Sequence, residues 1–381
     1  MKLDAPWLSE AGPRTVMEIL AQAGHQAFFV GGCVRNTVLG APVSDIDIAT
    51  SALPDEVAEL AQAAQIKAVP TGIAHGTLTL VAAEKSVEVT TFRKDVETDG
   101  RRAVVAFSDQ ILEDAMRRDF TMNALYADTN GYVRDPTGLG IADLEARVLR
   151  FIGAPEDRIR EDYLRILRFF RFHAWYAAPG FDADALAAVA EMSAGLETIS
   201  RERIGQEMRK LLLARSASSA LATMGHCGVL VHILPGADPS TETLLEAVEQ
   251  QAGAAPDWLR RLAALGGEDT AAHLRLSKTD ARDLEVLRHG IGSGIAPAAL
   301  GYKFGQGLGR DIVLLRAAML GSPFNPRDIA DVATGAAAEF PVRANDLMPR
   351  YQGPELGRKL AELEAMWIGS NFSMTRDDLL A

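Results

Sequence analysis

The sequence predicts an α+β fold in which a small mixed sheet with helices occupies the first part of the chain and helices alone fill the rest. Short runs rich in β-branched and aromatic residues alternate with helical stretches as far as Tyr132. From Asp143 onward almost every segment instead has the apolar spacing typical of helices. This change of pattern predicts a domain boundary near residues 145–150.

The elements before this boundary follow from local patterns. Strands are expected at 27–30, 45–49, 77–82, 87–92 and 124–126, and helices at 12–23, 54–65 and 110–123. The segment 93–109 is charged, contains Gly100 and lacks helical periodicity, so we expect a long, mobile loop there. Breaks between the later helices are expected at 153–155, 178–182, 235–241, 252–256, 290–297 and 321–326.

Composition excludes several classes of protein. A chain of 381 residues with 48% hydrophobic and 24% charged residues is close to the globular average, which argues against a wholly disordered chain or a coiled coil. Two cysteines are too few for a disulfide framework or a cysteine-based zinc site. No run reaches the roughly 18 apolar residues of a membrane span, and the N-terminus lacks a signal pattern. We therefore expect a soluble, cytoplasmic protein.

Charge is unevenly distributed along the chain. The net charge of −12 argues against a protein that coats nucleic acid by bulk electrostatics. Residues 1–150 carry 14 Lys and Arg against 21 Asp and Glu, and residues 216–381 carry 15 against 20. Residues 151–215 are balanced at 10 against 10, and nine of these ten cations are arginines. Because arginine suits bidentate recognition of phosphates and base edges, this middle segment is the predicted place of contact with a polyanion.

A pair of glycines follows the first predicted strand, in the segment FFVGGCVRNTVLG at 28–40. A strand that ends in Gly31-Gly32 and opens a helix lets backbone N–H groups approach an anion, and Arg35 adds a positive charge in the first turn. The segment is neither a Walker A loop nor a GxGxxG motif. A glycine pair alone is weak evidence, but the combination indicates a phosphate-binding turn.

Carboxylates follow in SDIDIAT at 44–50. Asp45 and Asp47 are two residues apart in a β-type run, so alternation predicts that both lie on the same face of the strand. Like charges this close repel unless a cation lies between them, and Mg²⁺ takes oxygen ligands of this kind. After the glycine turn, the pair predicts a metal site rather than a solvated strand edge. Glu88, mid-strand between apolar neighbours, is the candidate third catalytic carboxylate, with a structural salt bridge as the equal alternative.

The sequence resembles the class II tRNA nucleotidyltransferases, which add CCA to tRNA 3′ ends, and the related bacterial poly(A) polymerases. The motifs that carry the resemblance, in chain order, are GGCVRN…SDIDIAT (31–50), TGIAHGTLTLV (71–81), EVTTFRKD (88–95), RRDFTMNALY (117–126), DPTGLGIADL (135–144), EDYLRILRFFRF (161–172) and SRERIGQEMRKLL (200–212). The resemblance covers residues 28–215 densely and the remainder diffusely. One departure is Asn36, where the family usually has Asp.

The resemblance implies a nucleotidyltransferase head over 1–147, a helical neck over 148–215 that recognises the base, and a helical body and tail over 216–381 that bind tRNA. It implies that Asp45 and Asp47 hold Mg²⁺, the expected cofactor. The positions expected to contact the incoming CTP or ATP are Gly32, Arg35 and Arg118, and those expected to line the nucleotide pocket are Asp162, Arg165, Arg168 and Arg171.

The segment 161–172 points to the same chemistry without the resemblance. On a helical wheel its arginines step round one half, interleaved with apolar residues, and leave no clean solvated face. Such arginines must pair with acids or line a wet, anion-filled cleft. We favour the cleft, because three arginines at steps of three exceed the nearby acids Glu161 and Asp157. If Asp162 and Arg165 contact the base, as the resemblance implies, they would offer an acceptor and a donor, one helical turn apart, that match the Watson–Crick edges of cytosine and adenine.

The expected reaction is attack of a tRNA 3′-hydroxyl on the α-phosphorus of CTP or ATP, with release of pyrophosphate. Three alternatives stay open: a poly(A) polymerase, a specialist that adds only CC or only A, and a catalytically silent RNA-binding protein. By resemblance, the long segment 93–109 argues against a CC-only enzyme. The intact pair Asp45 and Asp47 argues against a silent protein. Nothing in the sequence predicts a protein partner.

Overall fold

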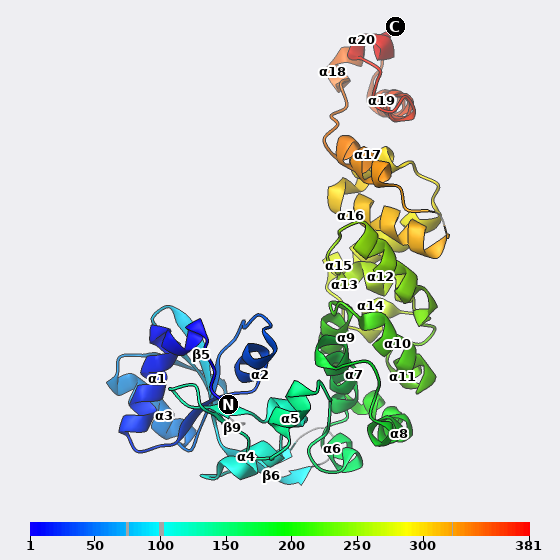
Figure 1. The fold of residues 1–381 in the computed structure, drawn as a ribbon. Helices are drawn as coiled ribbons and strands as arrows, with labels where there is room; N and C mark the ends of the chain where they lie inside the picture. The colour runs from blue at the N-terminus through cyan, green and yellow to red at the C-terminus, as the bar shows by residue number, and fades with distance from the viewer. Residues whose placement is uncertain (74–75, 99–102, 322) are drawn as a thin grey trace. The chain divides into compact units, whose positions relative to one another are not determined.

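The computed structural model describes residues 1–73, 76–98, 103–321 and 323–381 (Figure 1). The chain forms two compact units, one of residues 1–207 with 226–233 and the other of residues 208–225 with 234–381. The finer division at residues 147 and 215 stays a prediction. The predicted α+β class is confirmed, because the sheet is confined to the first unit and helices follow it.

A seven-stranded mixed sheet, in the order β3-β4-β5-β2-β1-β8-β9, forms the centre of the first unit. Its strands are β1 (Ala27–Val30), β2 (Asp47–Thr50), β3 (Lys67–Gly72), β4 (Thr77–Ala82), β5 (Lys85–Thr91), β8 (Tyr126–Ala127) and β9 (Val133–Arg134). β2 pairs antiparallel with β1 and parallel with β5, and this register places Asp47 opposite Glu88.

Side chains alternate across the sheet as expected for pleated strands. On one face Phe29 of β1 contacts Trp7 edge-on, with ring centroids 4.9 Å apart. On the other face Phe28 and Val30 join a buried cluster that includes Phe92 and Tyr126. The helices around the sheet are α1 (Ala11–Gln22), α2 (Gly32–Leu39), α3 (Pro54–Ala63), α4 (Ile111–Met116) and α5 (Gly140–Glu145), with short 3₁₀ turns η1 (Pro6–Ser9) and η3 (Thr121–Asn123). α1 and α3 both pack on β4 and β5 (Figure 1).

The expected loop at 93–109 is wrong for most of its length. Residues of β6 (Arg93–Thr98) and β7 (Ala103–Phe107) pair antiparallel in a separate two-stranded sheet, with a register shift between Asp95 and Glu97. The sequence hid this strand pair because charged residues dominate β6, which therefore lacks the apolar alternation by which a strand packed on a core is recognised. Residues 99–102, which include Gly100, lie outside the described part of the chain.

The helix expected at 110–123 is shorter than predicted. α4 ends at Met116, and the side chain of Asp119 then accepts hydrogen bonds from the Phe120 backbone N–H and from Asn123, at 2.9 Å each. These local bonds compete with helical hydrogen bonding, which is a common effect of Asp near a helix end. The turn they stabilise leads into η3 and β8.

The rest of the first unit is helical. Its elements are α6 (Pro155–Glu161), α7 (Leu164–Tyr176), α8 (Ala183–Met192), η4 (Ser193–Thr198), α11 (Val229–Ile233) and the first part of α9 (Arg201–Leu212). The sequence predicted one helix through 161–172, but α6 stops at Glu161 and α7 starts at Leu164. Asp162 between them has extended backbone angles, φ −155° and ψ 105°.

Among its described residues the second unit contains helices and one isolated β-bridge, between Ala237 and Gly266. The helices are the greater part of α10 (Ala217–His226), η5 (Pro239–Thr241), α12 (Glu242–Gln251), α13 (Trp258–Leu265), α14 (Thr270–His273), α15 (Lys278–Gly292), α16 (Pro297–Met319), α17 (Pro326–Ala336), α18 (Ala344–Leu347), α19 (Gly353–Gly369) and α20 (Arg376–Leu380). None of the described helices is long and apolar enough to cross a membrane.

Buried charges lie inside this second unit. Arg260 and Arg261 of α13 are almost fully buried, and both donate to Glu249 of α12. Arg260 also donates to Asp311 of α16 at 2.7 Å. Glu242, the first residue of α12, is fully buried, and neither of its carboxyl oxygens has a hydrogen-bond partner. This carboxyl is therefore the unsatisfied member of an otherwise paired cluster.

Candidate active site

A cavity of about 390 Å³ in the first unit brings together seven of the residues predicted from the sequence. These are Gly32, Arg35, Asp47, Arg118, Asp162, Arg165 and Arg168. Three predicted residues, Asp45, Glu88 and Arg171, do not line it. Gly31, part of the predicted glycine turn, also lines it. The remaining lining residues, which sequence reasoning did not assign to the site, are Arg117, Asp119, Asn123, Leu164, Phe172 and Arg203.

The glycine turn forms one wall of the cavity. Gly31 caps α2 with φ 70° and ψ −117°, a conformation that strains any residue with a Cβ. A Cβ built on Gly31 would lie 3.6 Å from Nη1 of Arg118, so the guanidinium faces this turn. The other nitrogens of Arg118 are anchored, because Nη2 donates to Asp114 at 2.9 Å and Nε donates to the Tyr126 hydroxyl at 3.0 Å. A fixed cation thus faces the space in front of Gly31.

Arg35 is held more tightly than the sequence suggested. It is buried, and its guanidinium donates to Asn123 Oδ1 at 2.5 Å, to Asn36 Oδ1 at 2.8 Å and to the Tyr176 hydroxyl at 3.0 Å. It also lies 4.1 Å from the ring centroid of Tyr176. Burial lowers the pKa of Arg35, although the interaction with Tyr176 opposes this shift. Arg35 therefore joins the glycine turn to α7 as well as lining the cavity.

Asn36, the residue that departs from the family pattern, has a local role. Its Oδ1 accepts from Arg35, and its Nδ2 donates to the Pro42 carbonyl oxygen at 2.7 Å. A carboxylate could replace the first interaction but could not donate the second. Asn36 thus connects Arg35 to the segment that leads into Asp45.

The three predicted carboxylates lie at different depths. Asp47 begins β2 and is half-buried, whereas Asp45 precedes the strand, is exposed and accepts from Ser44 Oγ at 2.8 Å. Strand alternation therefore does not apply to both aspartates. The argument that Glu88 occupies a costly position is also wrong, because Val87 and Val89 point into the core and Glu88 is exposed on the opposite face.

Negative charge is nevertheless concentrated around Asp47. Burial raises the pKa of Asp47 to about 6, and the charges of Glu88 and Asp45 add to the shift, while Arg118 opposes it. A divalent cation would neutralise this excess, and carboxylate oxygens are the ligands that Mg²⁺ prefers. No group of three or more His, Cys, Asp or Glu among the described residues is arranged to hold a metal ion. Asp45 and Asp47 are the residues that could hold Mg²⁺ here, because the charge of Asp45 adds to that of Asp47.

The arginines of α7 are all paired, which overturns the expectation that they exceed their acidic partners. Arg165 donates to Glu161 and Arg168 donates to Asp119, at 2.5 Å each. Arg171 donates to Glu207 of α9, also at 2.5 Å, and does not line the cavity. Sequence reasoning counted only acids within the same segment, whereas two of these partners are 49 and 36 residues away.

Asp119 connects these arginines to the glycine turn. Its Oδ1 accepts from Asn123, whose own Oδ1 accepts from Arg35, and its Oδ2 accepts from Arg168. Burial alone would raise the pKa of Asp119, but Arg168 and Asn123 lower it well below its ordinary value. A continuous chain of hydrogen bonds thus connects α2 to η3, and η3 to α7. A sequence signal for Asp119 existed in RRDFTMNALY (117–126), where it directly follows Arg118.

Asp162 and Arg165 do not share a helix face. Asp162 lies before α7, where its Oδ1 accepts from the Leu164 backbone N–H at 3.1 Å and its Oδ2 accepts from Arg203 at 2.6 Å. Arg165 is buried and donates to the carbonyl oxygens of Arg158 and Arg117 in addition to Glu161. Both residues still line the cavity, but the carboxylate and the guanidinium are positioned by different neighbours.

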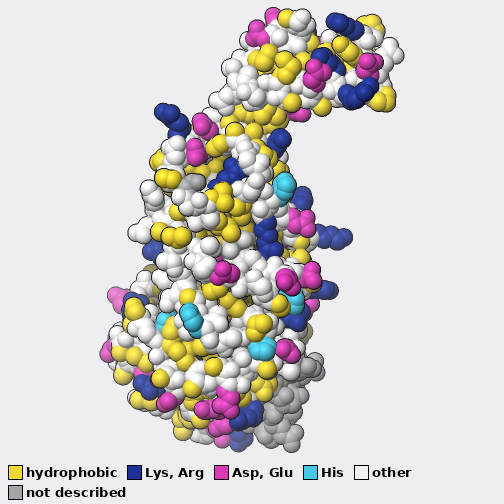
Figure 2. Space-filling model, turned by 90° about the vertical axis from the view of Figure 1, so that its right-hand side faces the viewer, with side chains coloured by type: hydrophobic (Ala, Val, Ile, Leu, Met, Phe, Trp, Pro, Cys, Tyr) yellow, Lys and Arg dark blue, Asp and Glu magenta, His cyan; other side chains and the backbone are white. Residues whose placement is uncertain are grey.

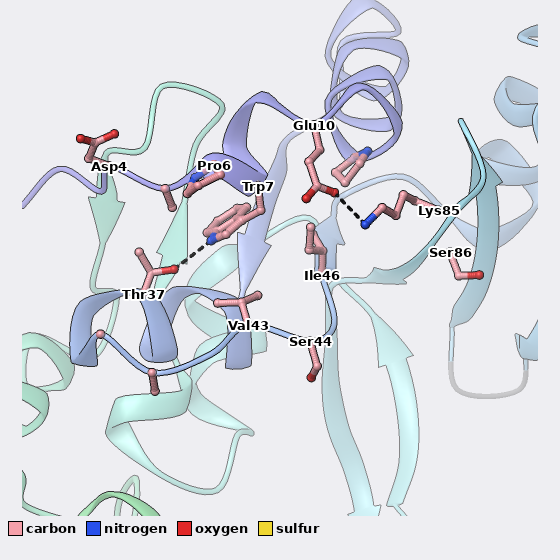
Figure 3. Close-up of a pocket in the computed structure, with 14 residues that line it drawn as sticks. Asp4, Pro6, Trp7, Glu10, Thr37, Val43, Ser44, Ile46, Lys85 and Ser86 are labelled. Atoms are coloured by element: carbon pink, nitrogen blue, oxygen red, sulfur yellow. Dashed lines mark hydrogen bonds and ion pairs between the residues drawn. The ribbon is translucent and has the colours of Figure 1, made fainter.

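A second cavity, of about 480 Å³, lies beside the segment that precedes Asp45 (Figure 3). Val43, Ser44 and Ile46 line it together with Trp7, whose Nε1 donates to Thr37 Oγ1 at 2.9 Å. Lys85 and Glu10 also line it and form an ion pair, with Nζ and Oε2 3.6 Å apart. None of the residues predicted for the active site lines this second cavity.

Comparison with known proteins relates the chain to nucleotidyltransferases. A family model described as the poly(A) polymerase head domain matches residues 27–150, and one described as the probable RNA- and SrmB-binding site of polymerase A matches residues 180–241. The CCA-adding enzyme of Streptococcus pneumoniae strain R6 is 32% identical over 96% of this chain and 95% of that protein. The mitochondrial CCA tRNA nucleotidyltransferase 1 of Danio rerio is 32% identical over 96% of this chain and 88% of that protein.

A solved structure shows the same relation. The Bacillus stearothermophilus CCA-adding enzyme in complex with CTP is 30% identical to this chain, with a TM-score of 0.79. The match covers 96% of this chain and 94% of that one.

Proposed function

Because the chain belongs to the family of CCA-adding tRNA nucleotidyltransferases, we propose that it adds C, C and A to tRNA 3′ ends from CTP and ATP. The reaction is attack of the terminal 3′-hydroxyl on the α-phosphorus of the nucleotide, with pyrophosphate as the leaving group. One observation carries this proposal. A single cavity places Asp47, the glycine turn and Arg118 together with Asp162 and Arg165.

In this proposal the glycine turn and Arg118 bind the triphosphate. The backbone at Gly31 and Gly32 can approach phosphate oxygens closely because no Cβ intervenes, and Arg118 Nη1 faces the same space. The bonds of Arg118 to Asp114 and Tyr126 keep its guanidinium oriented before the nucleotide arrives. Arg35 positions this wall through Asn123 and is not a freely moving ligand.

Asp45 and Asp47 would hold Mg²⁺ in this proposal. The metal would supply charge neutralisation at the reacting phosphate and lower the pKa of the attacking hydroxyl. The contribution of the chain is to keep two carboxylates close to each other and to Glu88, where their charges remain unbalanced. We propose that Glu88 acts through its negative charge on Asp47, because it has no ion-pair partner among the described contacts.

Asp162 and Arg165 are proposed to select the base, and Arg168 and Arg171 to support them. An acceptor beside a donor complements the amino group and ring nitrogen of cytosine and adenine, and it clashes with uracil and guanine. Arg168 and Arg171 act through Asp119 and Glu207, to which they are paired.

Residues 180–241 and the later helices are proposed to bind tRNA. Part of this range matches the family model whose description includes RNA binding. On the face that Figure 2 shows, Lys and Arg side chains are interspersed with Asp and Glu rather than gathered in one patch. The slope of tRNA affinity against salt concentration would measure how many phosphate contacts these residues make. The expected site of action is the cytoplasm.

A poly(A) polymerase is the second candidate, because both family models carry that description. The test uses a tRNA that lacks its last three nucleotides, incubated with Mg²⁺ and CTP alone, ATP alone, or both, followed by sequencing of the product. A CCA-adding enzyme should yield CC from CTP alone and CCA from both. A poly(A) enzyme should ignore CTP and extend with A, and a specialist should stop after CC or require a CC end. No incorporation would favour the silent RNA-binding protein.

A further inference from the structure

Asp162 is held from two sides by groups that belong to different helices. One oxygen accepts from the backbone N–H of Leu164 at the start of α7, and the other accepts from Nη2 of Arg203 on α9 at 2.6 Å. Because Asp162 lies between α6 and α7 in extended conformation, no helix fixes its side chain. Its orientation therefore depends on these two bonds.

The guanidinium of Arg165, the arginine expected to accompany Asp162, is held in place by other groups. Arg165 donates to Glu161 and to the carbonyl oxygens of Arg158 and Arg117, and its side chain is only 11% exposed. The Arg203 side chain is 40% exposed, and within the described part of the chain its guanidinium donates to Asp162 alone. Both Asp162 and Arg203 line the cavity. Arg203 is thus the cation in direct contact with the carboxylate.

We propose that Arg203 is the positioning residue for Asp162 and that nucleotide selection depends on it. This inference rests on the proposed function of the cavity. A carboxylate offers about four acceptor sites, and the two bonds from Leu164 and Arg203 leave the others for the exocyclic amino group of the base. With Arg203 removed, the carboxylate can rotate about its last torsion, because one of its two fixed oxygens is released. It would then present an acceptor in several directions and reject uracil and guanine less well.

The test compares Arg203→Ala, Arg203→Lys and the control Gln206→Ala, an exposed residue of the same helix. The measurement is kcat/KM for CTP and UTP on a tRNA that lacks its last three nucleotides, with CTP and UTP binding measured in parallel. Arg203→Ala should lower the preference for CTP over UTP about tenfold or more, the range expected for loss of one charged hydrogen bond. Arg203→Lys should restore part of the preference, and Gln206→Ala should keep it.

A double mutant tests whether Arg203 acts through Asp162. In an Asp162→Asn background, Arg203→Ala should change the preference by less than about twofold, because the oriented carboxylate is already absent. An equal effect in both backgrounds would overturn the proposal, as would Arg203→Ala with wild-type discrimination and only a lower melting temperature. If the unmodified protein adds no nucleotides to tRNA, the proposed function itself fails, and this outcome is distinguishable from the other two.

Discussion

We expect Glu242 to make the stability of the second, helical unit depend on pH. Burial raises the pKa of this carboxyl to about 8, the charge of Arg261 opposes the shift, and the charges of Glu246 and Glu249 add to it. Glu242 is also the first residue of α12, where the helix dipole favours a negative charge by about 0.3–1 kcal/mol. That gain is smaller than the cost of burying a charge without a hydrogen bond, so the neutral acid is the favoured folded form.

The sign and size of the effect follow from proton linkage. The folded state binds this proton more tightly than the unfolded state, so its contribution is fully present below the ordinary pKa of 4.5 and is lost as pH rises toward 8. At about 1.4 kcal/mol per pH unit, the loss reaches about 3 kcal/mol at pH 7 and about 5 kcal/mol above pH 8.5. Glu242→Gln cannot ionise and should not show this loss.

The assay is the free energy of unfolding from urea titrations followed by circular dichroism at pH 5, 7 and 9. Glu242→Gln should match the wild-type protein at pH 5 and exceed it progressively at higher pH. The control is Glu285→Gln on α15, an exposed residue whose replacement should shift the curve little at any pH. Parallel curves for Glu242→Gln and the wild-type protein between pH 5 and 9 would refute the reasoning.

Three further predictions concern the active site. Asp45→Ala or Asp47→Ala should abolish nucleotide addition while tRNA affinity, measured by filter binding, stays nearly unchanged; substantial activity in both single variants would contradict the metal assignment. Shortening the segment 93–109 should leave the melting temperature unchanged, because among the described residues β6 and β7 form a two-stranded sheet apart from the seven-stranded one. It should impair addition, and by resemblance to the family the final A should suffer most. A large drop in melting temperature, or unchanged CCA synthesis, would count against it. Asp162→Ala should weaken use of CTP and ATP and relax rejection of UTP and GTP; wild-type discrimination in a competition assay would move base selection elsewhere.

Local sequence patterns predicted the elements around the glycine turn, which forms one wall of the cavity. The strands at 27–30 and 77–82 have the predicted bounds, because alternation of buried and exposed side chains is a property of the strand itself. The positive φ of Gly31 likewise follows from a turn that only glycine adopts without strain. The glycine turn and Asp47 were therefore accessible to sequence reasoning.

Long-range pairing was not accessible. Arg168 is neutralised by Asp119, and Arg171 is neutralised by Glu207. Neither acid is near its arginine in the sequence. The end of α6 at Glu161 was missed for a related reason, because the bonds of Asp162 to Leu164 and Arg203 favour an extended residue there. The spacing of apolar residues alone predicts one continuous helix, because it does not show which side-chain hydrogen bonds compete with the helix.

The chain of bonds through Asp119 also constrains how this sequence can change. The Asp119 carboxylate accepts hydrogen bonds from Asn123 and Arg168, and Asn123 in turn accepts from Arg35. A single substitution at Asp119 therefore affects both the α2 side and the α7 side of the cavity. A replacement at any one of these positions leaves a buried partner without its hydrogen bond, and only a second replacement can relieve that cost. Across related sequences, positions 35, 119, 123 and 168 should therefore change together, although they are up to 133 residues apart.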